Sequence, residues 1–216
     1  MENMEIPGIE IAELLECNNI ERLIIEAHKN ELDIQGCRFR GCYEAHIDTS
    51  NLEFNTCEFS ASICLNAKFN QVSFTDVVFD NCDFSNTDFS ECNFVRVVFK
   101  NCKLVGCNFT NSHMYNTFFD GSNLSYSNMS LSHFRDVCFH SSKLSNASIQ
   151  EAVFKNVEFK YSNLIGIQMF RTNLKDIDFT TCDITGLVVM PQDLNGVIVD
   201  EYQAVELSRL LGIVIK

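Results

Sequence analysis

A bulky apolar residue returns at nearly every fifth position of this chain from Ile34 to Val199, and the register is never lost. In residues 81–95, which read NCDFSNTDFSECNFV, the residues Phe84, Phe89 and Phe94 stand five apart. A period of five fits neither the 3.6-residue repeat of an α-helix nor the alternation of an ordinary strand. Self-similarity at a fixed spacing is instead typical of a solenoid, in which each repeat packs only on its neighbours.

Grouping the repeat centres by twenty residues places like residues in register, as four repeats per coil would require. Small or β-branched residues, such as Cys82 and Thr87, stand two positions before the centres. Coils spaced about 4.8 Å apart would stack these columns and pair their backbones, giving a rod of roughly 40 Å. One column is aliphatic at Leu104, Leu124, Leu144, Leu164 and Ile184, and another is a predicted core ladder of eight phenylalanines: Phe39, Phe59, Phe79, Phe99, Phe119, Phe139, Phe159 and Phe179.

This pattern resembles the pentapeptide repeat family, and the resemblance covers all of residues 34–199. The resemblance implies a right-handed quadrilateral β-helix with four pentapeptides per coil, whose central residue and the residue two before it point inward. We therefore predict an all-β solenoid with short α-helical caps. Its expected parts are an N-terminal helical cap at residues 1–33, the β-helix at 34–199 and a C-terminal capping and dimerisation helix at 200–216.

The N-terminal part is predicted to cover the open end of the first coil, whose unpaired strand edge would otherwise invite another molecule to stack on it. Two short helices are expected there. An alternative is that residues 23–27 already form part of a coil, because Ile24 is in register with the repeat. The first helix would follow Pro7 and carry Ile9, Ala12 and Leu15, and the second would carry Ile20, Leu23, Ile24 and Ala27.

The repeat has polar residues at two of its centres, Glu44 and Thr49. The positions two before them, Cys42 and Ile47, keep the register. We therefore expect the two polar side chains to bend outward near the capped end, without an inserted loop. After Phe54 the spacing predicts no excursion longer than a turn.

The C-terminal segment begins with Asp200, and Gln203 follows three residues later, which is the pattern of a capping box. The helix that follows has an apolar arc wider than one side, so it needs two surfaces to bury it: the last coil and a second subunit. Gly212 can end it, and residues 213–215 could form a short strand. The residues predicted to form a homodimer contact are Tyr202, Val205, Leu207, Leu210, Leu211 and Ile213.

The formal net charge is −13, and the acids are unevenly placed. Residues 1–33 carry nine acids and two bases, and residues 41–95 carry nine acids against Lys68 alone. The half of the rod nearer the N-terminus is therefore a candidate acidic surface, or simply a solvated face that keeps the rod soluble. The acids taken as a candidate partner surface are Asp76, Asp80, Asp83, Asp88 and Glu91.

An apolar strip stands beside the phenylalanine ladder, at Val78, Val98, Phe118 and Cys138, where polar residues are usual. We consider two interpretations of it: local contact between neighbouring side chains, and a docking patch for a partner. Because these positions alternate with inward residues, their side chains are expected to point away from the core.

The cysteines and histidines follow the coil spacing rather than any ligand motif. Eight of the eleven cysteines fall in the small inward position, which fits free buried thiols in a reducing cytoplasm. Stacked pairs such as Cys37 with Cys57, or His113 with His133, could hold a metal, but a complete ligand set is missing. We expect no metal and no cofactor. No secretory pattern and no apolar run of membrane-spanning length occur, which predicts a cytoplasmic protein without a membrane partner.

Catalysis finds no support, because no nucleophile–base constellation, phosphate loop or zinc spacing is present. Direct nucleic-acid binding is disfavoured, because it needs a basic stripe. The closing pattern, an acid followed by Tyr-Gln-Ala, a Leu-rich helix and Leu-Gly-Ile, resembles the end of the Qnr-like quinolone-resistance proteins. That resemblance implies a dimeric DNA mimic that binds DNA gyrase or topoisomerase IV. The alternative is a protein-interaction scaffold with an unrelated partner.

Overall fold

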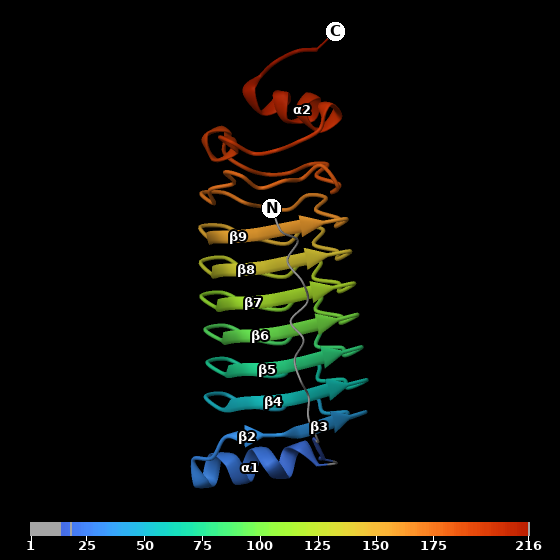
Figure 1. The fold of residues 1–216 in the computed structure, drawn as a ribbon, viewed down its shortest axis with the longest axis vertical. Helices are drawn as coiled ribbons and strands as arrows, with labels where there is room; N and C mark the ends of the chain where they lie inside the picture. The colour runs from blue at the N-terminus through green and yellow to red at the C-terminus, as the bar shows by residue number, and fades with distance from the viewer. Residues whose placement is uncertain (1–13, 18, 216) are drawn as a thin grey trace.

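The computed structural model describes residues 14–17 and 19–215 and shows a rod built of stacked coils (Figure 1). Seven successive coils contribute one parallel strand segment each, β3 to β9, and a helix lies at each end of the rod. The elements are β1 (Leu15–Glu16), α1 (Ile20–Asn30), β2 (Ile34–Gln35), β3 (Cys37–Arg40), β4 (Glu53–Ser60), β5 (Ser73–Asp80), β6 (Asn93–Lys100), β7 (His113–Asp120), β8 (His133–His140), β9 (Val153–Lys160), η1 (Pro191–Leu194), α2 (Glu201–Ser208) and η2 (Arg209–Leu211).

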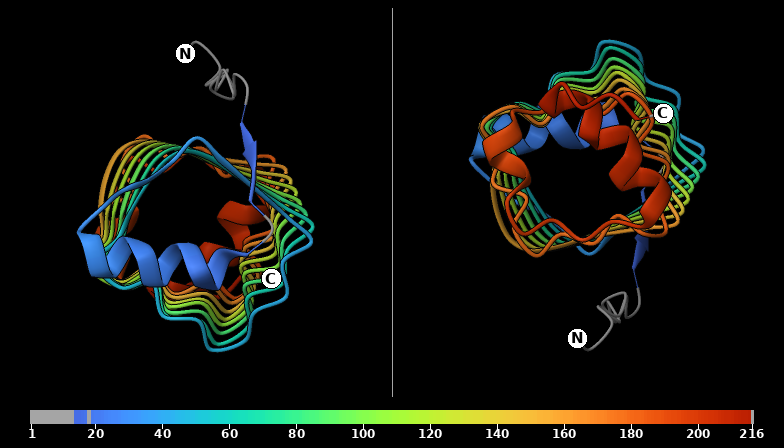
Figure 2. Two further views of the ribbon diagram at one scale, coloured as in Figure 1. Left: turned by 90° about the horizontal axis from the view of Figure 1, so that it is seen from below. Right: turned by 90° about the horizontal axis from the view of Figure 1, so that it is seen from above.

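From the β3 coil to the β9 coil, each coil pairs with the next at four places, always twenty residues apart. Between the β4 and β5 coils, for example, Phe54 aligns with Phe74 and Phe59 with Phe79, and two isolated bridges complete the circuit. Those bridges join residues 63 and 83, and residues 68 and 88. The predicted all-β solenoid with four repeats per coil is therefore confirmed. Seen along its axis, the coils follow one another around a common outline (Figure 2).

The corners of the rod explain the polar residues between the repeat centres. Corner residues adopt the left-handed backbone conformation, such as Asn86 at φ 59° and Asn101 at φ 53°. Asn, Asp and Gly tolerate this region better than β-branched residues do. At Gly121 (φ +61°), an added Cβ would also meet Oδ1 of Asn101, one coil earlier, at 2.7 Å. The corner residues are thus selected both for the left-handed turn and for the space that the neighbouring coil leaves.

The phenylalanine column forms a continuous stack inside the rod. From Phe39 to Phe159, successive ring centroids lie between 4.6 and 5.0 Å apart, and the last step, to Phe179, measures 5.7 Å. All eight side chains are at most 2% exposed. A second column places Phe74 between Phe54 and Phe94, with centroids 5.5 and 5.3 Å apart. Stacked rings add about 0.5–1.5 kcal/mol per pair beyond the area that they bury.

The helix α1 lies across the open end of the first coil (Figure 2). Asn19 caps it by accepting a hydrogen bond from the Arg22 backbone N–H, and Ile20, Ile24 and Ala27 are buried against the core. The predicted second helix and its covering role are therefore confirmed, and the alternative that these residues belong to a coil is wrong.

The predicted first helix is wrong at Leu15, which lies in β1 and pairs with Cys37 of β3. Its other predicted members, Ile9 and Ala12, lie outside the described residues. A strand forms here because the first coil offers it an unpaired edge, and backbone pairing to that edge outweighs the weak helical pattern of a short segment.

The expectation for the polar repeat centres is wrong at Thr49. This side chain is fully buried, and its hydroxyl donates to the Lys68 carbonyl at 3.1 Å, so a backbone acceptor satisfies the inward hydroxyl. Glu44 is half-buried. The repeat thus keeps its inward geometry at Thr49 even though the residue is polar.

The C-terminal helix is anchored to the last coils by a polar side chain. Asp200 and Gln203 form the predicted capping box, and Gln203 Nε2 also donates to the Phe179 and Cys182 carbonyls, both at 2.8 Å. After α2, η2 ends at Gly212 (φ 71°). Residues 213–215 have no regular secondary structure, so the predicted terminal strand is wrong. No described coil offers that segment a strand edge.

The ladder makes a quantitative prediction for stability. Phe99→Ala should lower the free energy of unfolding by about 3–5 kcal/mol, because it opens a cavity between two stacked rings. Phe154→Ala is the matched control, since Phe154 occupies a repeat centre but is only half-buried. It should cost clearly less. Urea denaturation followed by circular dichroism measures both free energies of unfolding. Equal losses in the two variants would contradict a special contribution of the stacked rings to stability.

Candidate functional site

The five acids of the predicted partner surface are spread around one coil rather than gathered on one face. Two of them are paired with bases twenty residues later. Asp76 accepts hydrogen bonds from both Nε and Nη2 of Arg96 at 2.6 Å, and Asp83 accepts one from Lys103 Nζ at 2.9 Å. Two more accept amide hydrogen bonds, Asp88 from Asn108 and Glu91 from Gln71, and Asp80 aligns with Lys100 in the sheet. The structure therefore distributes and partly neutralises this charge.

The carboxyl group of Asp83 illustrates how the repeat controls its acids. Partial burial by itself would raise its pKa, but hydrogen bonds from Ser85 and the Lys103 ammonium outweigh burial and hold the pKa below its usual range. The interaction therefore stabilises the fold at neutral pH and is lost as the pH falls through the lowered pKa. Because the side chain of Lys103 is 55% exposed, salt and solvent weaken the pair.

The apolar strip is packed on itself. Val98, Phe118 and Cys138 are at most 5% exposed and form a cluster separate from the core, with the half-buried Val78 against it. These residues are aligned neighbours in β5 to β8. Local packing between coils therefore accounts for the strip, and it presents little apolar area to a partner.

The stacked histidines do not form a ligand pair. The rings of His113 and His133 lie parallel, 4.8 Å apart with a 7° angle between their planes, so their nitrogen lone pairs do not converge. Within residues 14–17 and 19–215, no group of three or more His, Cys, Asp or Glu side chains could hold a metal ion.

The thiols face the interior and are poor nucleophiles. All described cysteines are free, and every one except Cys17 and Cys42 is buried. Burial raises the pKa of Cys64 to about 12, and it raises the pKa of Cys92 and Cys107 further. Cys37 and Cys57 are stacked neighbours. The hydrogen bond between their thiols lowers the pKa of Cys57 and raises the pKa of Cys37. Such thiols fill space rather than react.

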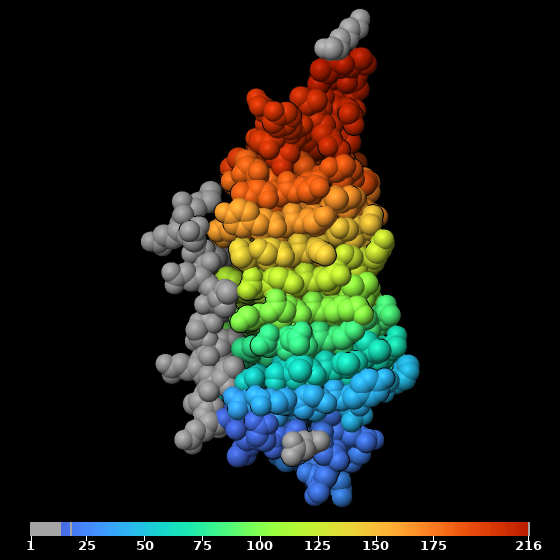
Figure 3. Space-filling view, turned by 90° about the vertical axis from the view of Figure 1, so that its right-hand side faces the viewer, coloured from blue at the N-terminus to red at the C-terminus, as the bar shows by residue number. Residues whose placement is uncertain are grey.

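The C-terminal end carries a group of exposed apolar side chains that are close together in the sequence. Of the six predicted dimer residues, Leu207 is buried on the last coil and the other five face solvent. We call the exposed set the C-terminal apolar surface. Figure 3 shows this end projecting beyond the broader stacked coils. The surface consists of Tyr202 (78% exposed), Val205, Leu210, Leu211 (63%), Ile213, Val214 and Ile215.

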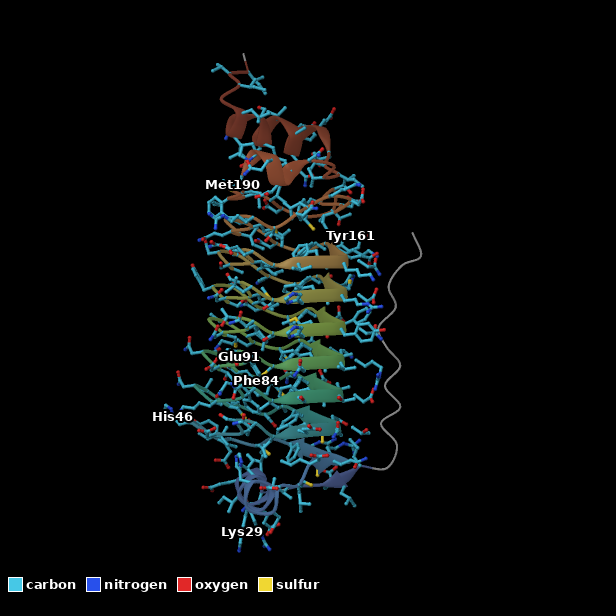
Figure 4. All side chains as sticks on the ribbon, turned by 90° about the vertical axis from the view of Figure 1, so that its left-hand side faces the viewer. Lys29, His46, Phe84, Glu91, Tyr161 and Met190 are labelled. Atoms are coloured by element: carbon cyan, nitrogen blue, oxygen red, sulfur yellow. The ribbon has the colours of Figure 1, made fainter. Side chains whose placement is uncertain are left out.

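A cavity of about 770 Å³ opens beside β9, and no feature of the sequence predicts it. It lies between β9 and residues 173–181, with Phe154, Val157 and Ile177 on its apolar part. Tyr161, which also lines it, follows the end of β9 and stands on the outer side of the rod in Figure 4. The five-residue register continues through this region without interruption, so only a change in the backbone path could create the space.

Neither α1 nor α2 resembles a membrane-spanning segment: among the described helices, none has both the length and the apolar character to cross a bilayer.

A four-sided parallel solenoid with a five-residue repeat defines the class of pentapeptide repeat proteins. A family model described as a pentapeptide repeat region matches residues 52–129 and 93–169, which together make up more than half of the chain. The chain therefore belongs to the pentapeptide repeat family. A comparison with curated proteins finds no match.

Solved structures match this chain at low sequence identity. A trypsin-treated variant of QnrB1, a plasmid-mediated fluoroquinolone resistance protein, matches with a TM-score of 0.51 and 18% identity, over 82% of this chain and 99% of that chain. HetL, a pentapeptide repeat protein involved in heterocyst differentiation regulation in the cyanobacterium Nostoc sp. strain PCC 7120, matches with a TM-score of 0.38 and 11% identity, over 84% and 94%. At such identities the likeness concerns the fold alone.

Thiol accessibility tests the packing of the cysteines. At pH 8 a colorimetric thiol reagent should rapidly label at most two of the eleven cysteines in the native protein and all eleven in guanidinium chloride. Burial keeps the reagent from nine of them, and for most of these a raised pKa also leaves little thiolate, since each unit of increase lowers its fraction about tenfold. Cys42→Ser should remove part of the fast native phase. Rapid native labelling of several further thiols would contradict the buried arrangement.

Proposed function

We propose that this protein is a non-enzymatic, rod-shaped homodimer that binds DNA gyrase or topoisomerase IV in place of DNA and protects the enzyme from quinolones. The observation that carries the proposal is the C-terminal apolar surface at the end of an acidic rod. Dimerisation there would place two rods end to end and form one long, negatively charged body.

The environment of α2 supports pairing at this end. Gln203 and Leu207 attach the helix to its own coils, whereas Tyr202, Val205 and Leu211 remain in solvent. Contiguous exposed apolar residues of this kind mark interaction surfaces. A two-fold axis would let the same surface of each subunit cover the other, which is the commonest arrangement of homo-oligomers.

The charge and the fold support the choice of partner. The net charge of −13 opposes direct binding to nucleic acid and suits a protein surface that normally holds DNA. QnrB1, whose fold this chain shares, is a fluoroquinolone resistance protein. The C-terminal sequence pattern adds a second, local resemblance to Qnr-like proteins.

A second candidate function is that of a scaffold for an unrelated protein partner. The ion pairs that join one coil to the next favour it, since they neutralise acids a DNA mimic would use. Asp76 is held by Arg96 and Asp83 by Lys103. The rod surface is accordingly a pattern of alternating charges rather than a uniformly negative one.

The dimer prediction is tested with Tyr202→Asp combined with Leu211→Asp. Light scattering should give a dimer for the native protein and a monomer for the double variant, because two carboxylates would be buried unpaired at the contact. Tyr126→Asp, at an exposed corner elsewhere on the rod, is the matched control and should remain dimeric. A native monomer would rule out this contact. Leu207 should not be used, because it faces the core.

The choice of partner is tested by gyrase supercoiling with and without ciprofloxacin. The native protein should restore supercoiling in the presence of the drug, or inhibit supercoiling at higher concentration in its absence. The monomeric double variant should do so at least tenfold less effectively. Neither rescue nor inhibition over a broad concentration range, from a protein that is dimeric by light scattering, would favour the scaffold function.

A further inference from the structure

The strand β9 is the free edge of the sheet within the rod. Strands β4 to β8 pair on both sides, but among the described residues β9 pairs with β8 alone and ends the strand order. In Figure 1 it is the uppermost arrow, and the coils above it carry none. On the sides flanking this strand, pairing continues to the next coil, for example from Ile149 N to Gln168 O and from Leu164 N to Asp183 O. The interruption is therefore local to β9.

The next coil leaves this edge of β9 unpaired because two of its downward-facing amides are bound within the coil itself: Lys175 N–H donates to Asn173 Oδ1 at 3.0 Å, and Thr180 N–H donates to Asp178 Oδ1 at 2.8 Å. Its upward-facing amides pair as they do in the other coils. Leu174 N, Asp176 N and Phe179 N donate to carbonyls of residues 193, 196 and 198, at 3.2, 2.9 and 2.9 Å. Within the described chain, no backbone hydrogen bond joins β9 to residues 173–180. The Tyr161 amide, which follows β9, is satisfied by the Thr181 hydroxyl at 3.1 Å. A side chain thus closes the end of the gap, and the gap itself keeps the cavity of about 770 Å³.

The register identifies which groups of β9 point into the gap. In the first coils, Gly36 N donates to Asn55 O at 3.0 Å, so the amide at this corner position faces the following coil. Asn156 occupies the same position in β9, and Phe154 N, two residues earlier, faces the same way. Phe154, fully buried in its equivalents Phe74 and Phe94, is only half-buried here.

We propose that this edge and its cavity form a docking site for an extended peptide segment of a partner protein, which adds as a strand to β9. A free strand edge presents alternating donors and acceptors that another extended backbone matches. The apolar part of the cavity, with Phe154, Val157 and Ile177, would receive an apolar side chain of the peptide. The rim carries both signs of charge, with Lys175 beside Asp176 and Asp178, so the backbone and the apolar side chain decide binding rather than net charge.

This inference is independent of topoisomerase binding and of the C-terminal contact. The site lies between β9 and residues 173–181, whereas α2, which carries the dimer surface, lies beyond the last coil (Figure 1). The size of the cavity falls within the range of about 300–1,000 Å³ that ligand sites occupy. A negative gyrase assay would not contradict peptide binding at β9, and a negative peptide titration would not contradict gyrase binding.

Hydrogen exchange of the protein alone tests the free edge. The amides of Phe154 and Asn156 should exchange at least tenfold faster than those of Phe134 and Asp136, which occupy the same positions one coil earlier and face a paired strand. Equal protection of the two sets would overturn the proposal, because it would mean that β9 has a partner already.

Peptide binding tests the occupant. The probe is the capped peptide SFTDV, the sequence of residues 73–77, which forms a strand at the equivalent position within this rod. Titrated into the ¹⁵N-labelled protein at millimolar concentration, it should shift the amides of β9 and residues 173–178 and slow exchange at Phe154 and Asn156. No shift, or shifts confined to other coils, would overturn the proposal.

Two control peptides separate strand addition from simple filling of an apolar pocket. They carry the same side chains but are N-methylated at alternate residues, in the two possible phases, so that one of them cannot donate to β9. That one should bind at least tenfold more weakly than SFTDV, and equal binding by all three would overturn strand addition. Phe154→Asp should abolish binding, whereas Tyr126→Asp, at an exposed corner away from the cavity, should leave it unchanged.

Discussion

The structure depends on one constraint: every coil must place the same kind of residue directly above its counterpart twenty positions earlier. The stacked rings from Phe39 to Phe179 and the backbone pairing around them satisfy it together. Each coil contacts only its two neighbours, so the stability of the rod is approximately a sum of neighbour terms. A rod of this kind needs no wide core, but it needs a cover at each end, which α1 and α2 supply.

The same register controls the exterior. Ion pairs join Arg38 to Glu58, Asp76 to Arg96 and Asp83 to Lys103, always one coil apart. Because equivalent side chains stand about 4.8 Å apart, like charges in a column would repel and opposite charges pair. An acidic composition therefore does not produce a uniformly negative rod. The surfaces that we propose for partners are the places where the pairing between coils ends or is interrupted: the C-terminal apolar surface and the β9 edge.

The N-terminal end of the rod shows both what sequence reasoning could predict and where it failed. The apolar periodicity of residues 20–27 was enough to predict α1, because a helix must bury that stripe. Leu15 was predicted to be helical but pairs with Cys37, because an open strand edge was available. Thr49 was expected to point outward, yet the coil held it inward and supplied the Lys68 carbonyl to its hydroxyl. For Leu15 and Thr49, a hydrogen-bond partner from another coil decided the outcome, and the local sequence does not show that partner.

The sequence by itself determined the solenoid, the phenylalanine ladder at twenty-residue spacing and the capping box at Asp200, because each of these rests on residue types at fixed spacings. Only the tertiary structure decided how the outward side chains are used. In the structure Phe118 is buried in the apolar strip, Asp76 and Asp83 pair with bases of the next coil, and Leu207 faces the core. The tertiary structure also opened the cavity at β9, where the Lys175 and Thr180 amides bond to the Asn173 and Asp178 side chains of their own coil and leave that edge of the strand unpaired.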